Sequence, residues 1–182
     1  VLFLGDHSSK QGDGCVHLIN HTSSSSLIVD EDKLILVDTG NRHQFDALKA
    51  GVEELGYSLE DITDVVLTHF HLDHASNLAL LPHHVNVYAW MHNWKYGETI
   101  RIGNLDGLQL TENVKIVLTP GHTPEHVSVV YSHEGKTIIF GGDAINHPYL
   151  KTQQVKSVNY DNELFAKYAD WMMETADIIV PG

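Results

Sequence analysis

Short apolar segments alternate with polar turns over the first forty residues. Four of them are rich in aliphatic or β-branched residues and predict strands: Val1–Leu4, Val16–Asn20, Ser26–Asp30 and Leu34–Asp38. Glu31-Asp32-Lys33 separates the last two segments and predicts a hairpin turn. The pattern therefore indicates that the chain begins with β-structure.

A helical period replaces this alternation over residues 41–55. Apolar residues recur there every three or four positions, and a glycine at position 56 ends the pattern. The stripe that we expect to pack on the core consists of Phe45, Leu48, Val52 and Leu55.

Strands and helices alternate in the rest of the chain. The pattern predicts strands over 65–67, 85–90, 115–119, 127–132, 137–140 and 178–180, helices over 74–81 and 164–176, and a helical turn over 91–96. The last helix is expected to bury Leu164, Tyr168, Trp171 and Met172. This order suits an α/β fold in which two sheets pack face to face with helices outside.

Composition narrows the class of protein. The 182 residues suit a single domain, 1–182, with a core that needs no disulfide, and Cys15 stands alone. The sequence contains neither an apolar run long enough to span a bilayer nor a signal peptide, so we expect no membrane contact and a cytoplasmic or nuclear location. The net charge of −13 and the lack of a Lys/Arg cluster are unlike a nucleic-acid-binding surface. The oligomeric state stays open, a homodimer included.

The most informative segment is the run from Thr68 to His74, which has the pattern His-x-His-x-Asp-His. His69 and His71 alternate along an extended segment and can therefore reach one metal ion together. Asp73 and His74 follow one turn later and can face a second ion.

Two further candidate ligands lie downstream, each after a predicted strand. His122 follows Thr119-Pro120-Gly121, and Asp143 follows Gly141-Gly142. Glycine at such turns lets the backbone pass close to a bound ion and places the next side chain at the mouth of the sheet.

Together with the earlier Leu36-Val37-Asp38-Thr39-Gly40, these motifs resemble the metallo-β-lactamase-fold hydrolases, in the right order and over nearly the whole chain. The resemblance implies a four-layer αβ/βα sandwich with two mixed β-sheets. It also implies two zinc ions in the complete protein, with iron or manganese as alternatives. By this resemblance the first ion is held by His69, His71 and His122 and the second by Asp73 and His74, with Asp143 bridging both; Asp38 would lie behind the ligands.

One expected ligand is missing from this pattern. The family takes a further histidine from a loop near the C-terminus, often as Pro-Gly-His, whereas this chain ends at Pro181-Gly182. Because the chain also starts without methionine, we expect the natural protein to continue past both ends. A less favoured alternative is that His147 replaces the missing ligand.

The predicted chemistry is hydrolysis by a metal-bound hydroxide that attacks an ester, thioester or phosphodiester. Asp73 is placed to orient the hydroxide and accept its proton. Candidates for protonating the leaving group are His126, His147, His92 and Tyr149, although an ordinary surface or loop position is the favoured explanation of each.

Within the superfamily, three segments resemble a small animal branch: Leu78–Pro82, His126–Val130 and Asp177–Gly182. That branch implies metal-dependent hydrolysis with RNA 3′-end processing as one proposed role, which the acidic composition disfavours. The substrate is thus either a small molecule or a nucleic acid. Two alternatives remain open: a mononuclear iron persulfide dioxygenase, and a metal-binding or regulatory protein without turnover.

Overall fold

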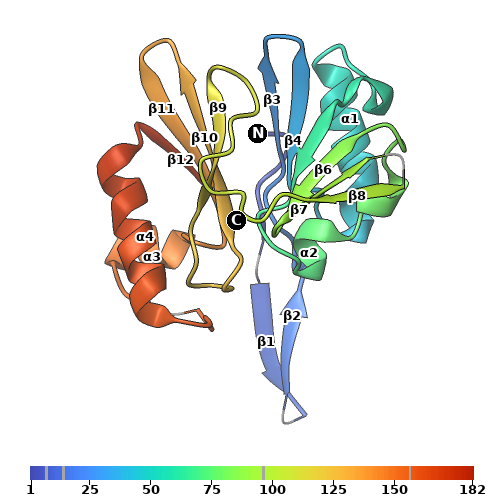
Figure 1. Cartoon of the computed structure of the whole chain (residues 1–182). Helices are drawn as coiled ribbons and strands as arrows, with labels where there is room; N and C mark the ends of the chain where they lie inside the picture. Colours follow the sequence, from blue (N-terminus) through green and yellow to red (C-terminus); the bar gives the residue numbers. More distant parts are fainter. Residues whose placement is uncertain (7, 14, 96, 156) are drawn as a thin grey trace.

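The computed structural model describes residues 1–6, 8–13, 15–95, 97–155 and 157–182. Two β-sheets face each other, as predicted (Figure 1). Helix α1 (Phe45–Glu54) packs on the outside of one sheet, and α3 (His147–Thr152) and α4 (Asn162–Thr175) pack on the outside of the other (Figure 1). The predicted four-layer sandwich is therefore confirmed.

The larger sheet has six strands in the order β3-β4-β5-β6-β7-β8. Strands β4, β5 and β6 are parallel, and the remaining neighbours are antiparallel. The strands are β3 (Ser26–Asp30), β4 (Lys33–Val37), β5 (Asp64–Val66), β6 (Asn86–Ala89), β7 (His92–Lys95) and β8 (Glu98–Arg101). The short helix α2 (Leu72–Ala75) follows β5.

The second sheet has four strands in the order β12-β11-β10-β9. Only the β11–β12 pair is parallel, so this sheet is mixed too. Its strands are β9 (Val114–Leu118), β10 (Val127–His133), β11 (Lys136–Gly142) and β12 (Ile178–Pro181). A separate two-stranded ribbon, β1 (Ser8–Gly12) and β2 (Cys15–Ile19), extends away from both sheets (Figure 1).

Three apolar clusters hold the layers together. The central cluster joins the two sheets, for example through Val37 and Val66 of one and Ile116 and Val129 of the other. A second lies between the larger sheet and α1, and a third lies between the smaller sheet, α3 and α4. Burial of this apolar surface is the main favourable free energy of such a fold, and it fixes the strand ends on which the site is built.

The helical predictions were right in place but partly wrong in detail. Helix α1 buries Leu48 and Val52, whereas Leu55 is exposed beyond its end. Helix α4 buries Met172 as expected, but its other buried residues are Phe165 and Ala169, so the stripe is rotated from the predicted one. The predicted helix over 74–81 is split into α2 and a 3₁₀ turn over 78–80.

Several segments have a different structure from the predicted one, because pairing with a neighbouring strand decides whether they form strands. The helical turn expected over 91–96 is strand β7, and β8 was not predicted at all; residue 96 lies outside the described residues. Both are recruited as a hairpin to the edge of β6, through pairs such as Val87 with Trp94 and Trp94 with Thr99. Residues 1–4 contribute only one bridge, from Phe3 to Ser25. Strand β1 and helix α3 were also missed.

Candidate metal centre

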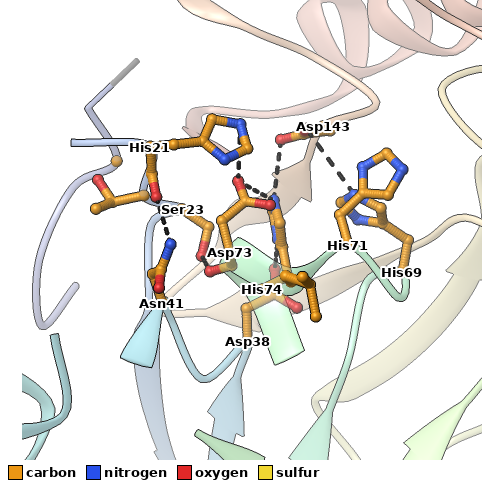
Figure 2. A network of polar contacts seen from close by, with 12 residues as sticks. His21, Ser23, Asp38, Asn41, His69, His71, Asp73, His74 and Asp143 are labelled. Carbon is orange, nitrogen blue, oxygen red and sulfur yellow. Dashed lines mark hydrogen bonds and ion pairs between the residues drawn. The ribbon is translucent and has the colours of Figure 1, made fainter. Parts of the chain in front are cut away.

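The predicted ligands converge at one end of the sandwich, between the two sheets. His69 and His71 lie in the loop after β5, and Asp73 and His74 lie in α2 (Figure 2). His122 and Asp143 come from the other sheet, just after β9 and β11 respectively. The structure therefore brings together all six side chains that the sequence singled out.

Four of these side chains surround one position. One donor atom from each of His69, His71, His122 and Asp143 lies within 4.8 Å of the other three. The closest pairs are His71 Nδ1 with His122 Nε2 at 3.0 Å, and His122 Nε2 with Asp143 Oδ2 at 3.2 Å. Three imidazoles and a carboxylate at such separations are a donor set that suits zinc.

Hydrogen bonds behind the histidines select which nitrogen faces this position. Thr68 donates its hydroxyl proton to Asp38 Oδ2 at 2.8 Å, so its oxygen can accept from His69 Nδ1–H at 3.1 Å. His122 Nδ1–H can likewise donate to Asn159 Oδ1 at 3.2 Å. The Nε2 atoms of His69 and His122 are then left with lone pairs directed at the site, which is how outer partners orient metal ligands.

The second group forms around Asp73 and His74. His74 Nε2 lies 3.6 Å from Asp73 Oδ2 and 3.3 Å from Asp143 Oδ1, so Asp143 faces both groups (Figure 2). On its other side, His74 Nδ1 contacts Asp38 Oδ2 at 2.7 Å. Asp38, which is 2% exposed, also accepts the Thr68 backbone N–H at 2.8 Å. Its predicted place behind the ligands is thus where the structure puts it.

Buried polar atoms without hydrogen-bond partners mark where a ligand is needed. Among the described residues, His69 Nε2, His74 Nε2 and Asp73 Oδ2 are buried and make no hydrogen bond. Leaving such groups unpaired costs about 1–3 kcal/mol each. All three are directed into the site, so the residues present fit metal ions at this place.

Electrostatics around the ligands agree with this arrangement. Burial and the neighbouring histidines lower the pKa values of His69 and His71, which keeps both imidazoles neutral. Burial would also lower the pKa of His74, but the carboxylates of Asp38 and Asp143 outweigh it and raise that pKa. Burial opposes ionisation of Asp143, yet contacts with His74, His69 and His122 hold its pKa well below the usual range. The metal-free site thus already favours an ionised Asp143 beside neutral His69 and His71, whereas His74 keeps its proton until an ion binds.

Two glycines allow the ligand loops to approach so closely. Gly142 has φ 49°, and a Cβ there would lie 2.6 Å from Thr68 Oγ1. Gly121 has φ 147°, and a Cβ there would lie 2.4 Å from the backbone nitrogen of Phe165. A side chain at either position would therefore push Asp143 or His122 away from the site.

Of the residues predicted as proton donors, only some lie at the cavity. His147 lines the cavity beside the ligands. Tyr149 is buried and points elsewhere, with its hydroxyl on Asp170 Oδ1 at 2.9 Å, and His92 packs between Trp90 and Trp94. These positions favour His147 over Tyr149 and His92 as a donor to a bound substrate.

His126 is not a cavity residue but part of the support for the ligands. It is fully buried, its ring lies 5.0 Å from that of His69, and its Nδ1 contacts Thr119 Oγ1 at 3.0 Å. Burial, foremost, lowers its pKa from 6.5 to about 3. His126 is therefore neutral near pH 7, so it cannot act as a general acid toward a leaving group.

The lowered pKa of His126 predicts a specific acid sensitivity. Between pH 6.5 and 3 the unfolded chain binds a proton here that the folded chain does not, so stability falls as the pH falls. From pH 7 to pH 5 this group should cost about 2 kcal/mol of unfolding free energy. Urea unfolding of the metal-free proteins at pH 7 and pH 5 measures this cost. The decrease in unfolding free energy between the two pH values should be smaller in His126→Gln than in the wild type by about 2 kcal/mol. Equal losses in the two proteins would contradict the assignment.

An open cavity of about 1080 Å³ leads to the ligands. Its floor includes His71, Asp73, His122 and Asp143. Its walls include four apolar residues, Leu18, Leu72, Pro148 and Val158. Of the described residues that line it, none is lysine or arginine.

Comparison with known proteins gives consistent matches. The sequence profile described as the Metallo-beta-lactamase superfamily matches residues 19–103. Metallo-beta-lactamase domain-containing protein 1 of Xenopus laevis is 28% identical over 152 residues, which cover 81% of this chain and 65% of that protein. A Methanocaldococcus jannaschii protein named as a probable metallo-hydrolase is 26% identical over 145 residues, which cover 68% of each chain. A solved Thermotoga maritima structure assigned to the metallo-β-lactamases has a TM-score of 0.71 at 25% identity, covering 98% of this chain and 92% of that one.

Proposed function

We propose that this chain, which belongs to the metallo-β-lactamase superfamily, hydrolyses uncharged esters or thioesters that carry an apolar group. The superfamily and the fold follow from the matches, as the sequence predicted, and the relative named as a probable metallo-hydrolase supports hydrolysis as the activity. The matched relative from Xenopus extends beyond this chain, which spans 65% of its length. The substrate, the zinc ions and their number are our proposal.

The observation that carries this proposal is the lining of the cavity above the ligands. Leu72 and Val158 are 78% and 92% exposed, and Leu18 is 54% exposed, so apolar side chains are offered to whatever enters. Binding a substrate with an apolar group would remove this surface from water, which is favourable. The lack of lysine and arginine among the described lining residues disfavours a phosphodiester or RNA, whose backbone is held mainly by cationic side chains.

The chain's own residues would divide the chemistry between them. Divalent metal ions, when bound, lower the pKa of water towards neutrality and supply a hydroxide nucleophile. Asp73 presents a buried oxygen, Oδ2, that can orient this nucleophile and accept its proton. His147, on the cavity wall, is placed to return a proton to the leaving alkoxide or thiolate. The apolar walls hold the remainder of the substrate and exclude water from it.

A substrate series on metal-loaded protein tests the proposal. Each methylene buried contributes about 0.8 kcal/mol, so lengthening the acyl group of an aryl ester by two carbons should raise kcat/KM about tenfold. Thioesters should follow the same trend, and bis-aryl phosphodiesters and RNA should be cleaved far more slowly. In Leu72→Ser the dependence on acyl length should weaken, whereas in the exposed control Leu55→Ser it should not change.

Two results would contradict the proposed function. Cleavage of RNA or phosphodiesters faster than of esters would exclude the substrate class. One iron ion per chain, with oxygen consumption in the presence of a persulfide, would replace hydrolysis by the dioxygenase alternative.

A further inference from the structure

We propose that His21, from the segment between β2 and β3, is a ligand of the second metal ion. The inference rests on the proposed dinuclear site and adds a donor that the ligand motifs do not contain. It assigns to the second position His21, Asp73 and His74, with Asp143 shared between the two positions.

Distances around Asp73 carry the inference. His21 Nε2 lies 3.6 Å from Asp73 Oδ2, and His74 Nε2 lies 3.6 Å from the same oxygen on its other side (Figure 2). A zinc ion with tetrahedral donors at about 2.0–2.1 Å places neighbouring donor atoms about 3.3–3.4 Å apart. Hydrogen-bonded nitrogen and oxygen atoms lie closer, at about 2.7–3.2 Å. Spacings of 3.6 Å therefore suit atoms that share an ion better than atoms that bond each other.

Two of the donor atoms at this position are buried and make no hydrogen bond. Asp73 Oδ2 and His74 Nε2 are both buried without a hydrogen bond, and the His21 ring approaches the same oxygen. Asp143 closes the group from the opposite side, with Oδ1 3.3 Å from His74 Nε2. Two histidines and two carboxylates thus converge, a mixed donor set that accepts zinc, manganese or iron.

The backbone around His21 is held by the elements that carry Asp73 and His74. Asn41 donates its side-chain N–H to the His21 carbonyl at 2.8 Å (Figure 2). Two residues on, Ser23 donates its hydroxyl to the Asp73 carbonyl at 2.7 Å. Asn77, just after α2, donates to the Asn41 carbonyl at 2.8 Å. These contacts fix the imidazole relative to the carboxylate, as a ligand requires.

A purely structural alternative is an ion pair in which protonated His21 neutralises Asp73. Direct ligation and this ion pair predict different metal contents. An ion pair with Asp73 would compete with the second ion, so its removal would leave metal content unchanged or higher. Loss of a ligand would lower the affinity for that ion alone.

Metal titration of the full chain separates these cases. In zinc buffered by a chelator, wild-type protein should bind two ions, and His21→Ala and His21→Gln should each bind the second at least about tenfold more weakly. His21 is 36% exposed, so either variant should keep its fold, which circular dichroism checks. The control His133→Ala, which changes an exposed histidine of β10, should bind two ions as the wild type does.

Cobalt substitution tests direct ligation independently of affinity. In His21→Cys loaded with two cobalt ions, a thiolate-to-cobalt charge-transfer band should appear that is absent from the wild type, whose Cys15 is exposed on β2. Two tightly bound ions in His21→Ala would overturn the inference while the proposed function stood. Fewer than two ions in the wild type would instead remove the dinuclear site, and the inference would fall with it.

Discussion

Replacing Asp73 by alanine is expected to reduce turnover by about 10²–10⁴-fold while the first metal ion stays bound. The two effects separate because Asp73 lies outside the four-donor group formed by His69, His71, His122 and Asp143. Its Oδ2 is directed instead at His74 and His21. Steady-state kinetics on the preferred ester, together with metal analysis of the same sample, measure both effects.

Two further variants make this experiment specific. Asp73→Asn keeps the volume of the side chain but cannot accept a proton as a carboxylate does, so its rate should fall nearly as far as that of the alanine variant. Asp46→Ala, at an exposed position in α1, should change neither rate nor metal content. A wild-type rate in Asp73→Ala would remove the assigned role, and loss of both metal ions would show that the two positions are not separable.

The sequence predicted the layers of the fold because their signals are local. The stripe of α1 and the alternating residues of β3 bury one face, whereas the apolar runs of β4 and β10 are buried on both faces. The order of elements then leaves few ways to pack them. Strands β7 and β8 could not be predicted in this way. Apart from the half-buried Trp94, their residues are polar or exposed, and they become strands only because the edge of β6 supplies hydrogen-bond partners.

The candidate site was predictable to the extent that its predicted ligands lie in compact sequence motifs. His69, His71, Asp73 and His74 lie within six residues, and His122 and Asp143 each follow a glycine that the close approach of the backbone demands. His21 carries no such motif. Its position near Asp73 depends on Asn41 and Ser23, whose hydrogen bonds span 20 and 50 residues of sequence.

His126 is a residue to which the sequence assigned a role that its burial excludes. Four residues after His122, and in a chain rich in histidine, it suggested a proton donor. Its burial beneath His69 reverses that interpretation, because a neutral imidazole held by Thr119 packs on the predicted ligand His69 and does not line the cavity. Burial of this kind depends on how both sheets pack around the loop, and no local pattern reports it.

The identity of the substrate depends on the cavity walls rather than on the ligands. Leu18, Leu72 and Val158 come from β2, α2 and the segment before α4, and only the fold places them around one opening. The structure also reports no helix, within the described residues, that is long and apolar enough to cross a membrane.

Replacing His122 by alanine is expected to remove the first metal ion and, with it, a measurable part of the stability. His122 Nε2 lies 3.0 Å from His71 Nδ1 and 3.2 Å from Asp143 Oδ2, at the centre of the four-donor group. At a free metal concentration of 100 Kd, binding adds about 2.7 kcal/mol to the free energy of unfolding. For a chain of this size that loss corresponds to a decrease in Tm of about 5–10 °C.

Thermal melts with and without chelator separate this metal effect from packing. If His122 acts as a ligand, wild type and variant should differ in Tm when metal is present and by much less when it is removed, because the variant then loses only the polar contacts with His71, Asp143 and Asn159. The exposed control His133→Ala should match the wild type in both conditions. Undiminished zinc content in His122→Ala would mean that the imidazole is not a ligand. Since His122 is the only predicted histidine ligand supplied by the second sheet, the ion would then have to be held by the loop after β5 and Asp143 alone.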